Sequence, residues 1–233
     1  MEMRQVFAQY LAEEMRKNEN IVVVDADLAR AYGTLALRKE FPGRALDVGV
    51  AEADMVSVAA GLSSYGFIPY CTSFTPFMTR RVCDQVAISG AYAKSNIKCV
   101  GTDPGLTADY NGGTHMSVED IGVLRSIPTM TIVEPCDEVA LRALLPQITA
   151  HEGVVYLRLF RKEAPKVYGD GETFDLNKAK IVREGKDITI LCSGIMVKYA
   201  IEAADALKEN GVAAEVIDVF TVKPIDRETL VAS

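Results

Sequence analysis

The residue with the clearest capacity for chemistry is Glu52, a carboxylate that opens a run of small and apolar residues. The apolar members of this run, such as Val50, Met55 and Leu62, can cover most of the surface of a helix, so we expect a buried helix. Glu52 then lies in the first turn, where the positive end of the helix dipole favours an anion. The pattern alone leaves two roles open: an acid that transfers a proton, or an acid that only stabilises the helix end.

Two aromatic residues and a glycine-rich loop follow downstream of Glu52. Phe74 and Phe77 precede a helix expected over residues 79–93, and by spacing alone such phenylalanines are more typical of a core than of a binding site. His115 ends the loop segment Asn111–His115, whose two glycines let a backbone approach a ligand closely. A loop imidazole can transfer protons near neutral pH, although a single loop histidine is more often a plain surface residue.

The elements that must position these residues alternate between strand and helix. An amphipathic helix is expected over residues 3–17, strands over 21–24, 44–48, 66–71, 97–102, 129–133 and 154–159, and further helices over 118–126 and 136–150. The β-branched run at 21–24 indicates a strand buried on both faces. This alternation predicts an α/β fold, a parallel sheet with helices on both faces. Asp25 and Asp27, at the end of the first strand, are either ligand groups or turn acids.

The composition changes after residue 161. Residues 162–186 are polar, contain Pro165 and three glycines and show no helical period, so we expect an interdomain linker with a short strand at its end. A strand over 187–192, a helix to about 210 and a strand over 213–219 then form one βαβ unit. Because one such unit buries its sheet poorly, we expect a first domain at 1–161 and the start of an incomplete second domain at 187–233.

Composition and charge exclude several classes of protein. The chain has 233 residues, a formal net charge of −7 and no cluster of lysine and arginine, which argues against nucleic-acid binding. No apolar run is long enough for a membrane span and no signal peptide opens the chain, so a cytoplasmic location is expected. Five scattered cysteines and two isolated histidines predict reduced thiols and no self-contained metal site.

In their order along the chain, these motifs resemble the transketolase family. The resemblance runs from Arg4 to about Pro224 and is carried by the segments Ala26–Leu28, Gly49–Val56, Ser73–Arg80, Asp84–Gln85, Gly113–His115, Glu119–Asp120, Pro128 and Phe160–Arg161. The chain is similar to the pyrimidine-binding domain of transketolase followed by the start of its C-terminal domain. It looks like the separately encoded C-terminal section of a split transketolase.

The resemblance implies thiamine diphosphate and Mg²⁺ as cofactors. In the family, a carboxylate held against N1′ of the aminopyrimidine promotes the imino tautomer that takes the C2 proton of the thiazolium ring. The aligned carboxylate is Glu52. Phe74, Phe77 and Arg80 match residues around the pyrimidine, and Phe77 is the one expected to stack on it.

The resemblance also implies a substrate site for transfer of a two-carbon ketol unit between a ketose phosphate and an aldose phosphate. His115 matches a histidine that faces the ketose hydroxyls, and Arg4 and Arg161 match arginines that hold the sugar phosphate through their planar guanidinium groups. Two substrate positions depart from the family: Asp103 replaces a histidine near the phosphate, and Asn111 replaces an aspartate that contacts donor hydroxyls. Because a carboxylate repels a phosphate at close range, a branched, shortened or otherwise unusual sugar phosphate is compatible with the sequence.

The diphosphate-binding half of the family's site is expected on another chain. The family uses a Gly-Asp-Gly motif with a more distant asparagine, whereas Gly169–Gly171 lies in the expected linker without a preceding core strand, so we interpret it as a turn. The resemblance therefore implies an N-terminal-section transketolase subunit as partner, an α2β2 assembly and no activity of this chain alone.

Two alternatives stay open beside this interpretation. The first is a related thiamine enzyme, either a 2-oxoacid dehydrogenase β subunit or a deoxyxylulose-phosphate synthase-like enzyme; the Gly-Gly-Thr-His loop and Arg161 favour transketolase over both. The second is a non-catalytic regulatory subunit on the same fold. Glu52, Phe77 and His115 argue against it, because a scaffold needs none of them.

Overall fold

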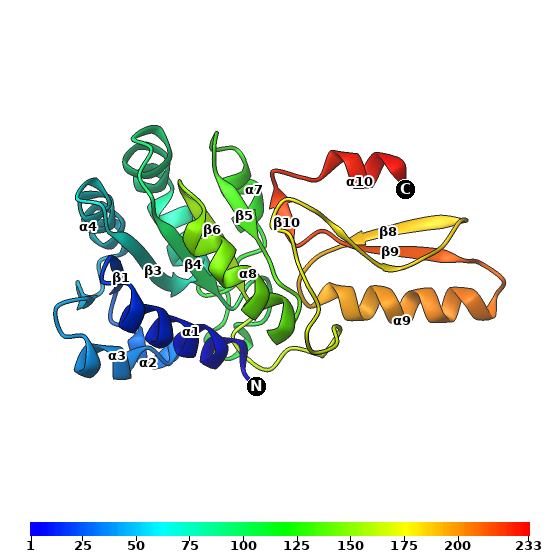
Figure 1. Cartoon of the computed structure of the whole chain (residues 1–233), viewed down its shortest axis with the longest axis horizontal. Helices are drawn as coiled ribbons and strands as arrows, with labels where there is room; N and C mark the ends of the chain where they lie inside the picture. Colours follow the sequence, from blue (N-terminus) through cyan, green and yellow to red (C-terminus); the bar gives the residue numbers. More distant parts are fainter.

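The computed structural model, which describes residues 1–233, contains a large sheet between two layers of helices (Figure 1). Its parallel strands are β1 (Ile21–Asp25), β2 (Ala45–Asp47), β3 (Ile68–Phe74), β4 (Lys98–Thr102), β5 (Thr131–Val133) and β6 (Val155–Leu159). The strand order is β10-β5-β6-β4-β3-β1-β2, and β10 (Thr221–Lys223) pairs with β5 in the antiparallel sense. The predicted α/β fold with a parallel sheet is confirmed, with an antiparallel edge strand that the sequence pattern did not reveal.

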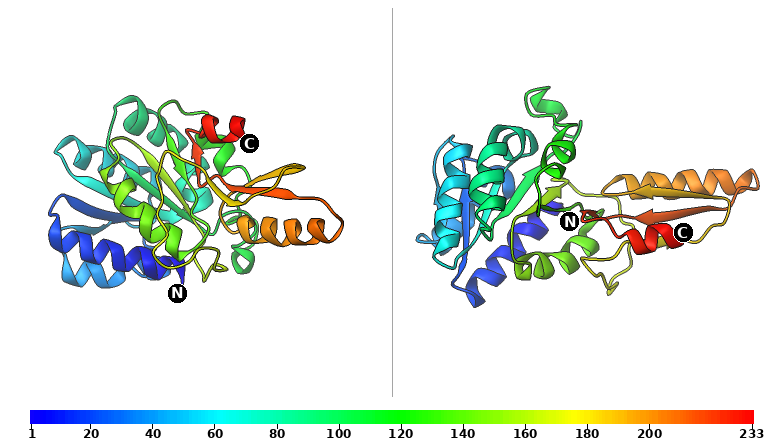
Figure 2. Two further views of the ribbon diagram at one scale, coloured as in Figure 1. Left: turned by 45° about the vertical axis from the view of Figure 1, so that its right-hand side comes forward. Right: turned by 90° about the horizontal axis from the view of Figure 1, so that it is seen from above.

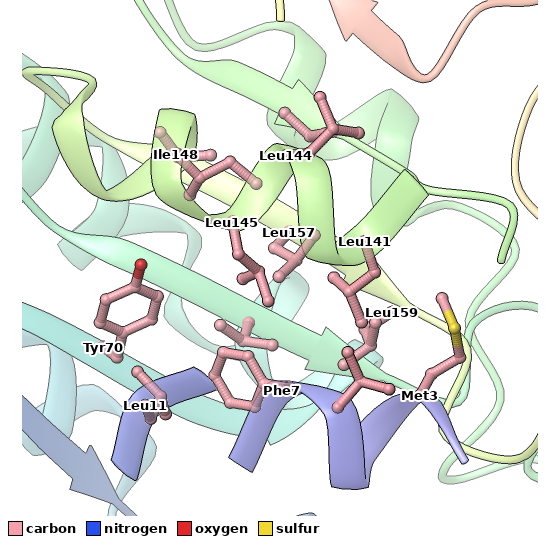
Figure 3. Close-up of a cluster of buried hydrophobic side chains, with 14 of the residues drawn as sticks. Met3, Phe7, Leu11, Tyr70, Leu141, Leu144, Leu145, Ile148, Leu157 and Leu159 are labelled. Carbon is pink, nitrogen blue, oxygen red and sulfur yellow. The ribbon is translucent and has the colours of Figure 1, made fainter. Parts of the chain in front are cut away.

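One face of the sheet is covered by α1 (Met3–Lys17) and α8 (Glu138–Ala150), with α2 (Ala29–Tyr32) and α3 (Leu35–Glu40) beside them. Figure 3 shows Phe7 and Leu11 of α1 and Leu145 of α8 close to Tyr70 and Leu157 of the sheet. Met3, Phe7, Leu11 and Met15 recur every four residues and are all fully buried, which is why this segment is an amphipathic helix. Each such side chain contributes about 1.5–3 kcal/mol by leaving water.

The other face is covered by α4 (Glu52–Ser64), the helical segment 75–92 and α7 (Asp120–Arg125). Helix α4 buries Met55, Val56 and Ala59 together with Glu52, but it exposes its opposite side, including Ser57 and Gly61. The expectation that this helix is buried over most of its surface is therefore wrong. Small residues raise the apolar content of the segment without forming a second apolar face, so only one face packs on the sheet.

The helix expected over residues 79–93 is a broken helical segment that begins earlier. It consists of α5 (Thr75–Met78), the 3-10 turn η1 (Arg80–Val82), α6 (Cys83–Gln85) and the π-helical turn η2 (Val86–Tyr92). Pro76 lies in the first turn of α5, where its missing N–H costs no hydrogen bond. Phe77 is therefore inside the helical segment, and its ring can meet side chains of the following turn.

A second, smaller sheet projects from the large one (Figure 2). It contains β7 (Lys180–Arg183), β8 (Ile188–Cys192) and β9 (Ala214–Asp218) in the order β7-β9-β8, with α9 (Met196–Glu209) packed on it. The expected βαβ unit corresponds to β8, α9 and β9. The chain then returns through β10 to the large sheet and ends in α10 (Arg227–Ala232). The division at 161 and 187 stays a prediction, and none of the helices combines the length and apolar character needed to cross a membrane.

Asp218 lies at the end of β9, where the small sheet contacts the segment around Tyr168. Its carboxyl is fully buried, and Oδ2 accepts a hydrogen bond of 2.9 Å from the Tyr168 hydroxyl. Burial raises the pKa of Asp218 from 3.8 to about 7, against the opposing effect of its hydrogen bonds. The folded protein thus binds this proton more tightly than the unfolded chain, so the free energy of unfolding falls as the pH rises from about 4 to about 7.

We expect Asp218→Asn to stabilise the protein more at pH 8 than at pH 5, because only the aspartate must ionise in the core as the pH rises. The difference between the two conditions is expected to be about 1–3 kcal/mol in the free energy of unfolding, measured by urea denaturation. Asp170→Asn, which removes an exposed carboxylate paired with Lys166, is the control and should show no such difference. Equal effects of Asp218→Asn at both pH values would contradict the assignment.

Candidate active site

The residues singled out in the sequence lie along the carboxyl edge of the large sheet. Phe74 ends β3, Asp103 follows β4 and Arg161 follows β6, and these three strands are neighbours in the sheet. Glu52 begins α4, the helix that follows β2. Open α/β sheets bind their ligands at this edge. The fold therefore gathers side chains that are far apart in the sequence where a ligand site is expected.

Glu52 is buried and paired. Its residue is only 4% exposed, and Oε1 accepts a hydrogen bond of 2.8 Å from Nη1 of Arg81. The free N–H groups of the first turn of α4 and the guanidinium of Arg81 both favour a carboxylate at this position. The carboxylate of Glu52 is therefore shielded from solvent, and it contacts Arg81 in addition to the end of its own helix.

Arg81 is the residue of this site that sequence reasoning missed. Its guanidinium carbon lies 3.9 Å from the centroid of the Phe77 ring, in a cation–π contact, while the same group binds Glu52. The usable signal was its position four residues after Phe77, the spacing that brings two side chains together on a helical segment. Arg80, which was predicted instead, pairs with Glu119 at 2.8 Å and lines the same cavity.

His115 completes an aromatic cluster with Phe74 and Phe77. The imidazole centroid lies 5.2 Å from Phe74 and 5.0 Å from Phe77, in edge-to-face arrangements, and the two phenylalanine rings are 6.2 Å apart. The Oγ1 atom of Thr114 lies 2.9 Å from Nδ1 and orients the ring. An open cavity of about 630 Å³ beside this cluster is lined by Pro76, Phe77, Arg80, Arg81, Thr114 and His115.

Arg4 and Arg161 lie next to each other beyond the aromatic cluster. The backbone N–H of Arg4 donates to the carbonyl of Arg161 at 3.2 Å, and the Arg161 guanidinium lies 5.5 Å from the centroid of Phe74. Nε of Arg161 is also 3.0 Å from Oδ2 of Asp103. Contacts thus run without a break from Glu52 to these arginines. Asn111 is not part of this series, because it lies in the exposed turn η3 (Asp109–Asn111).

A second, larger cavity of about 750 Å³ separates the loop after β4 from β8 and α9. Its charged and polar side chains already form ion pairs and hydrogen bonds with each other. Arg158 pairs with Asp120 and Glu134, and the Ser193 hydroxyl donates to Glu134 at 2.7 Å. The remaining lining is mainly apolar. This cavity offers no unpaired charge, so we assign no reaction to it.

The chemistry of the first cavity suits a flat heteroaromatic ring with a nitrogen that can be protonated. Glu52, which binds the cavity residue Arg81, can share a proton with such a nitrogen, and the Phe77 ring can stack on a bound ring that displaces Arg81 from it. These residues fit the aminopyrimidine of thiamine diphosphate. No group of three or more histidine, cysteine, aspartate and glutamate side chains lies in a metal-binding arrangement, and Asp170 of Gly169–Gly171 lies in an exposed turn.

Family models and related proteins match the chain over nearly its whole length. The family model for the transketolase pyrimidine-binding domain matches residues 1–166, and the model for the transketolase C-terminal domain matches residues 177–233. A 6-deoxy-6-sulfo-D-fructose transketolase subunit of Clostridium sp. strain MSTE9 is 51% identical over 99% of this chain and 72% of its own length. An apulose-4-phosphate transketolase subunit of Phocaeicola vulgatus is 36% identical over 97% of this chain and 73% of its own length.

A solved structure extends the comparison to three dimensions. A split-gene transketolase, described as an inactive β4 tetramer, superposes with a TM-score of 0.90 at 37% identity, over 100% of this chain and 76% of that one. Both domain matches, the two relatives and this structure lead to the same assignment. The chain belongs to the transketolase family and corresponds to the C-terminal section of a split transketolase.

Proposed function

We propose that this chain is the C-terminal-section subunit of a thiamine diphosphate-dependent enzyme that transfers a two-carbon ketol unit from a ketose to an aldose. The observation that carries the proposal is the buried carboxylate of Glu52, which binds Arg81, while Arg81 contacts the Phe77 ring and lines an open cavity with it. The family assignment supports it. When bound, thiamine diphosphate supplies the nucleophilic carbon that carries the transferred unit.

Glu52 is the proposed proton-sharing group for the aminopyrimidine. Its burial and its position at the start of α4 keep water away from the shared proton. Arg81 holds Glu52 and covers the Phe77 ring in the free chain, so a ring that binds there competes with the guanidinium for both. Phe74 supports Phe77 from the side, and Arg80 lines the cavity.

His115, Arg4 and Arg161 are the proposed substrate residues. The imidazole is held among aromatic rings at the rim of the cavity, where it can donate to or accept from a sugar hydroxyl. Phe74 contacts both His115 and Arg161, and Arg4 lies next to Arg161 through a backbone hydrogen bond. This order suits a ketose that places its reacting carbons near Glu52 and its terminal anion near the arginines.

The terminal anion is either a phosphate or a sulfonate. Ketose and aldose phosphates are the substrates implied by the family resemblance. A sulfonate is the second candidate because the relative with 51% identity is named for 6-deoxy-6-sulfo-D-fructose. For the assembly, we propose an N-terminal-section subunit that holds the diphosphate and Mg²⁺, an α2β2 complex and a cytoplasmic location. The similarity to a split-gene transketolase supports the two-subunit enzyme.

The test is a transfer assay with the chain combined with an N-terminal-section transketolase subunit. Fructose 6-phosphate and 6-deoxy-6-sulfofructose serve as donors and ribose 5-phosphate as acceptor, with products identified by mass spectrometry. We expect transfer that requires thiamine diphosphate and Mg²⁺. Decarboxylation of 2-oxoacids without ketol transfer would favour the dehydrogenase alternative, and no reaction with any donor would favour the regulatory subunit.

A further inference from the structure

Asp103 is a buried negative charge inside the cationic end of the proposed substrate site. Its side chain is only 1% exposed, and its backbone has a φ of +57°, a left-handed conformation that aspartate tolerates better than most residues. Nε of Arg161 lies 3.0 Å from Oδ2, yet neither carboxylate oxygen accepts a hydrogen bond of good geometry. A buried carboxylate without hydrogen bonds is costly, so its position calls for an explanation beyond local stability.

Three cations surround Asp103, and each has its own carboxylate. Burial raises the pKa of Asp103, whereas Arg161, Lys162 and Arg4 oppose that rise, so all three act on it. Arg4 pairs with Glu2 at 2.7 Å, and Lys162 lies 3.7 Å from Asp109.

The three carboxylates differ in how easily each can move away from its cation. The side chains of Glu2 and Asp109 are 33% and 65% exposed, so both can turn into water when a substrate anion approaches the arginines. Asp103 is enclosed and cannot be solvated in the same way. A bound anion therefore shares Arg161 with one fixed negative charge.

We propose that Asp103 is a specificity-determining residue that favours a singly charged terminal sulfonate over a doubly charged phosphate ester. The proposal rests on the function proposed above, in which Arg4 and Arg161 bind the end of the sugar. Sulfonate and phosphate both present three terminal oxygens, so the arginine forks can bind them in similar ways. They differ in charge, because a phosphate monoester carries about −1.5 to −2 at pH 7. Repulsion by a buried carboxylate acts on that additional charge and is weakly screened.

The test compares the two donors in the reconstituted two-subunit enzyme. We expect the wild type to have at least about a tenfold higher kcat/KM for 6-deoxy-6-sulfofructose than for fructose 6-phosphate. Asp103→Asn keeps the size of the side chain and tolerates a positive φ, but removes the charge. It is expected to move the ratio of the two kcat/KM values at least about tenfold toward the phosphate, mainly through KM.

The matched control is Glu163→Gln, which removes an exposed carboxylate close in sequence to Arg161 and should leave the ratio unchanged. A purely structural role of Asp103 would lower both kcat/KM values together. An unchanged ratio in Asp103→Asn, or a wild type that prefers the phosphate, would overturn the inference while leaving ketol transfer established. Absence of transfer from both donors would instead refute the proposed function.

A second measurement keeps the inference testable if Asp103→Asn does not fold. The second pKa of a phosphate ester is about 6, so its charge approaches that of a sulfonate as the pH falls from 8 to 5.5. The wild-type preference should shrink over this range, and protonation of Asp103 would act in the same direction. The charged side chains that act on Asp103 are Arg4, Arg161 and Lys162, and burial holds the pKa of the nearby Tyr32 far above its usual value. His115 is proposed to face hydroxyls that both sugars share, so a change at His115 affects both donors alike. A ratio of kcat/KM values that stays constant from pH 8 to 5.5 would therefore contradict the inference.

Discussion

Glu52→Gln is expected to reduce the kcat of the reconstituted enzyme by about 10²–10⁴-fold while leaving the fold intact. The amide has the size of the acid and can still accept the hydrogen bond from Arg81, but it cannot take up and return a proton. Half of the Arg81 side chain is in contact with solvent, at 46% exposure, so loss of the ion pair leaves its charge hydrated. The measurement is kcat with saturating cofactor and substrates, together with urea denaturation of the free chain.

Asp54→Asn is the matched control for this substitution. Asp54 also lies in the first turn of α4, where it benefits from the same helix dipole, but its side chain is exposed. The control should retain wild-type kcat and lose a few tenths of a kcal/mol of stability, about the size of a surface dipole interaction. Wild-type turnover in Glu52→Gln would end the assignment of Glu52 as the proton-sharing acid and leave it as a helix-end acid.

The parts of the fold that could be predicted are those in which local pattern decides structure. The repeat of Met3, Phe7 and Leu11 produces a helix wherever its apolar face finds a partner. The run Ile21–Asp25 produces a strand because β-branched side chains suit a sheet buried on both faces, and the structure places successive residues in opposite cores. These elements can be predicted from local sequence without knowing which segments they contact.

The parts that could not be predicted depend on contacts between distant segments. β10 was invisible because a strand of three residues forms only where an edge of the large sheet is available to it. The sequence could predict that the charge of Asp103 repels a phosphate. It could not predict that Asp103 is completely buried against Arg161. Arg81 was passed over because the resemblance favoured its neighbour Arg80, and only the fold brings α4 and η1 together.

The chain without its partner is expected to show no ketol transfer and to bind thiamine diphosphate with a Kd of about 1 mM or weaker. Stacking on Phe77 contributes about 0.5–1.5 kcal/mol, and a charge-assisted hydrogen bond to Glu52 about 1.5–3 kcal/mol. Association costs about 4–15 kcal/mol in lost translational and rotational freedom, so these two contacts leave little or no net binding free energy. Binding must in addition displace Arg81, which holds both groups in the free chain.

Titration calorimetry of the free chain and of the mixed subunits measures this difference. Addition of the N-terminal-section subunit should produce submicromolar cofactor affinity and transfer activity that reaches a plateau at equal amounts of the two chains. Micromolar binding or turnover by this chain alone would contradict a split site. Arg81→Met gives a second comparison, because it frees Phe77 without supplying diphosphate contacts. The absent diphosphate contacts, and not the displacement of Arg81, are expected to limit cofactor affinity. Arg81→Met should therefore also stay inactive until the partner subunit is added.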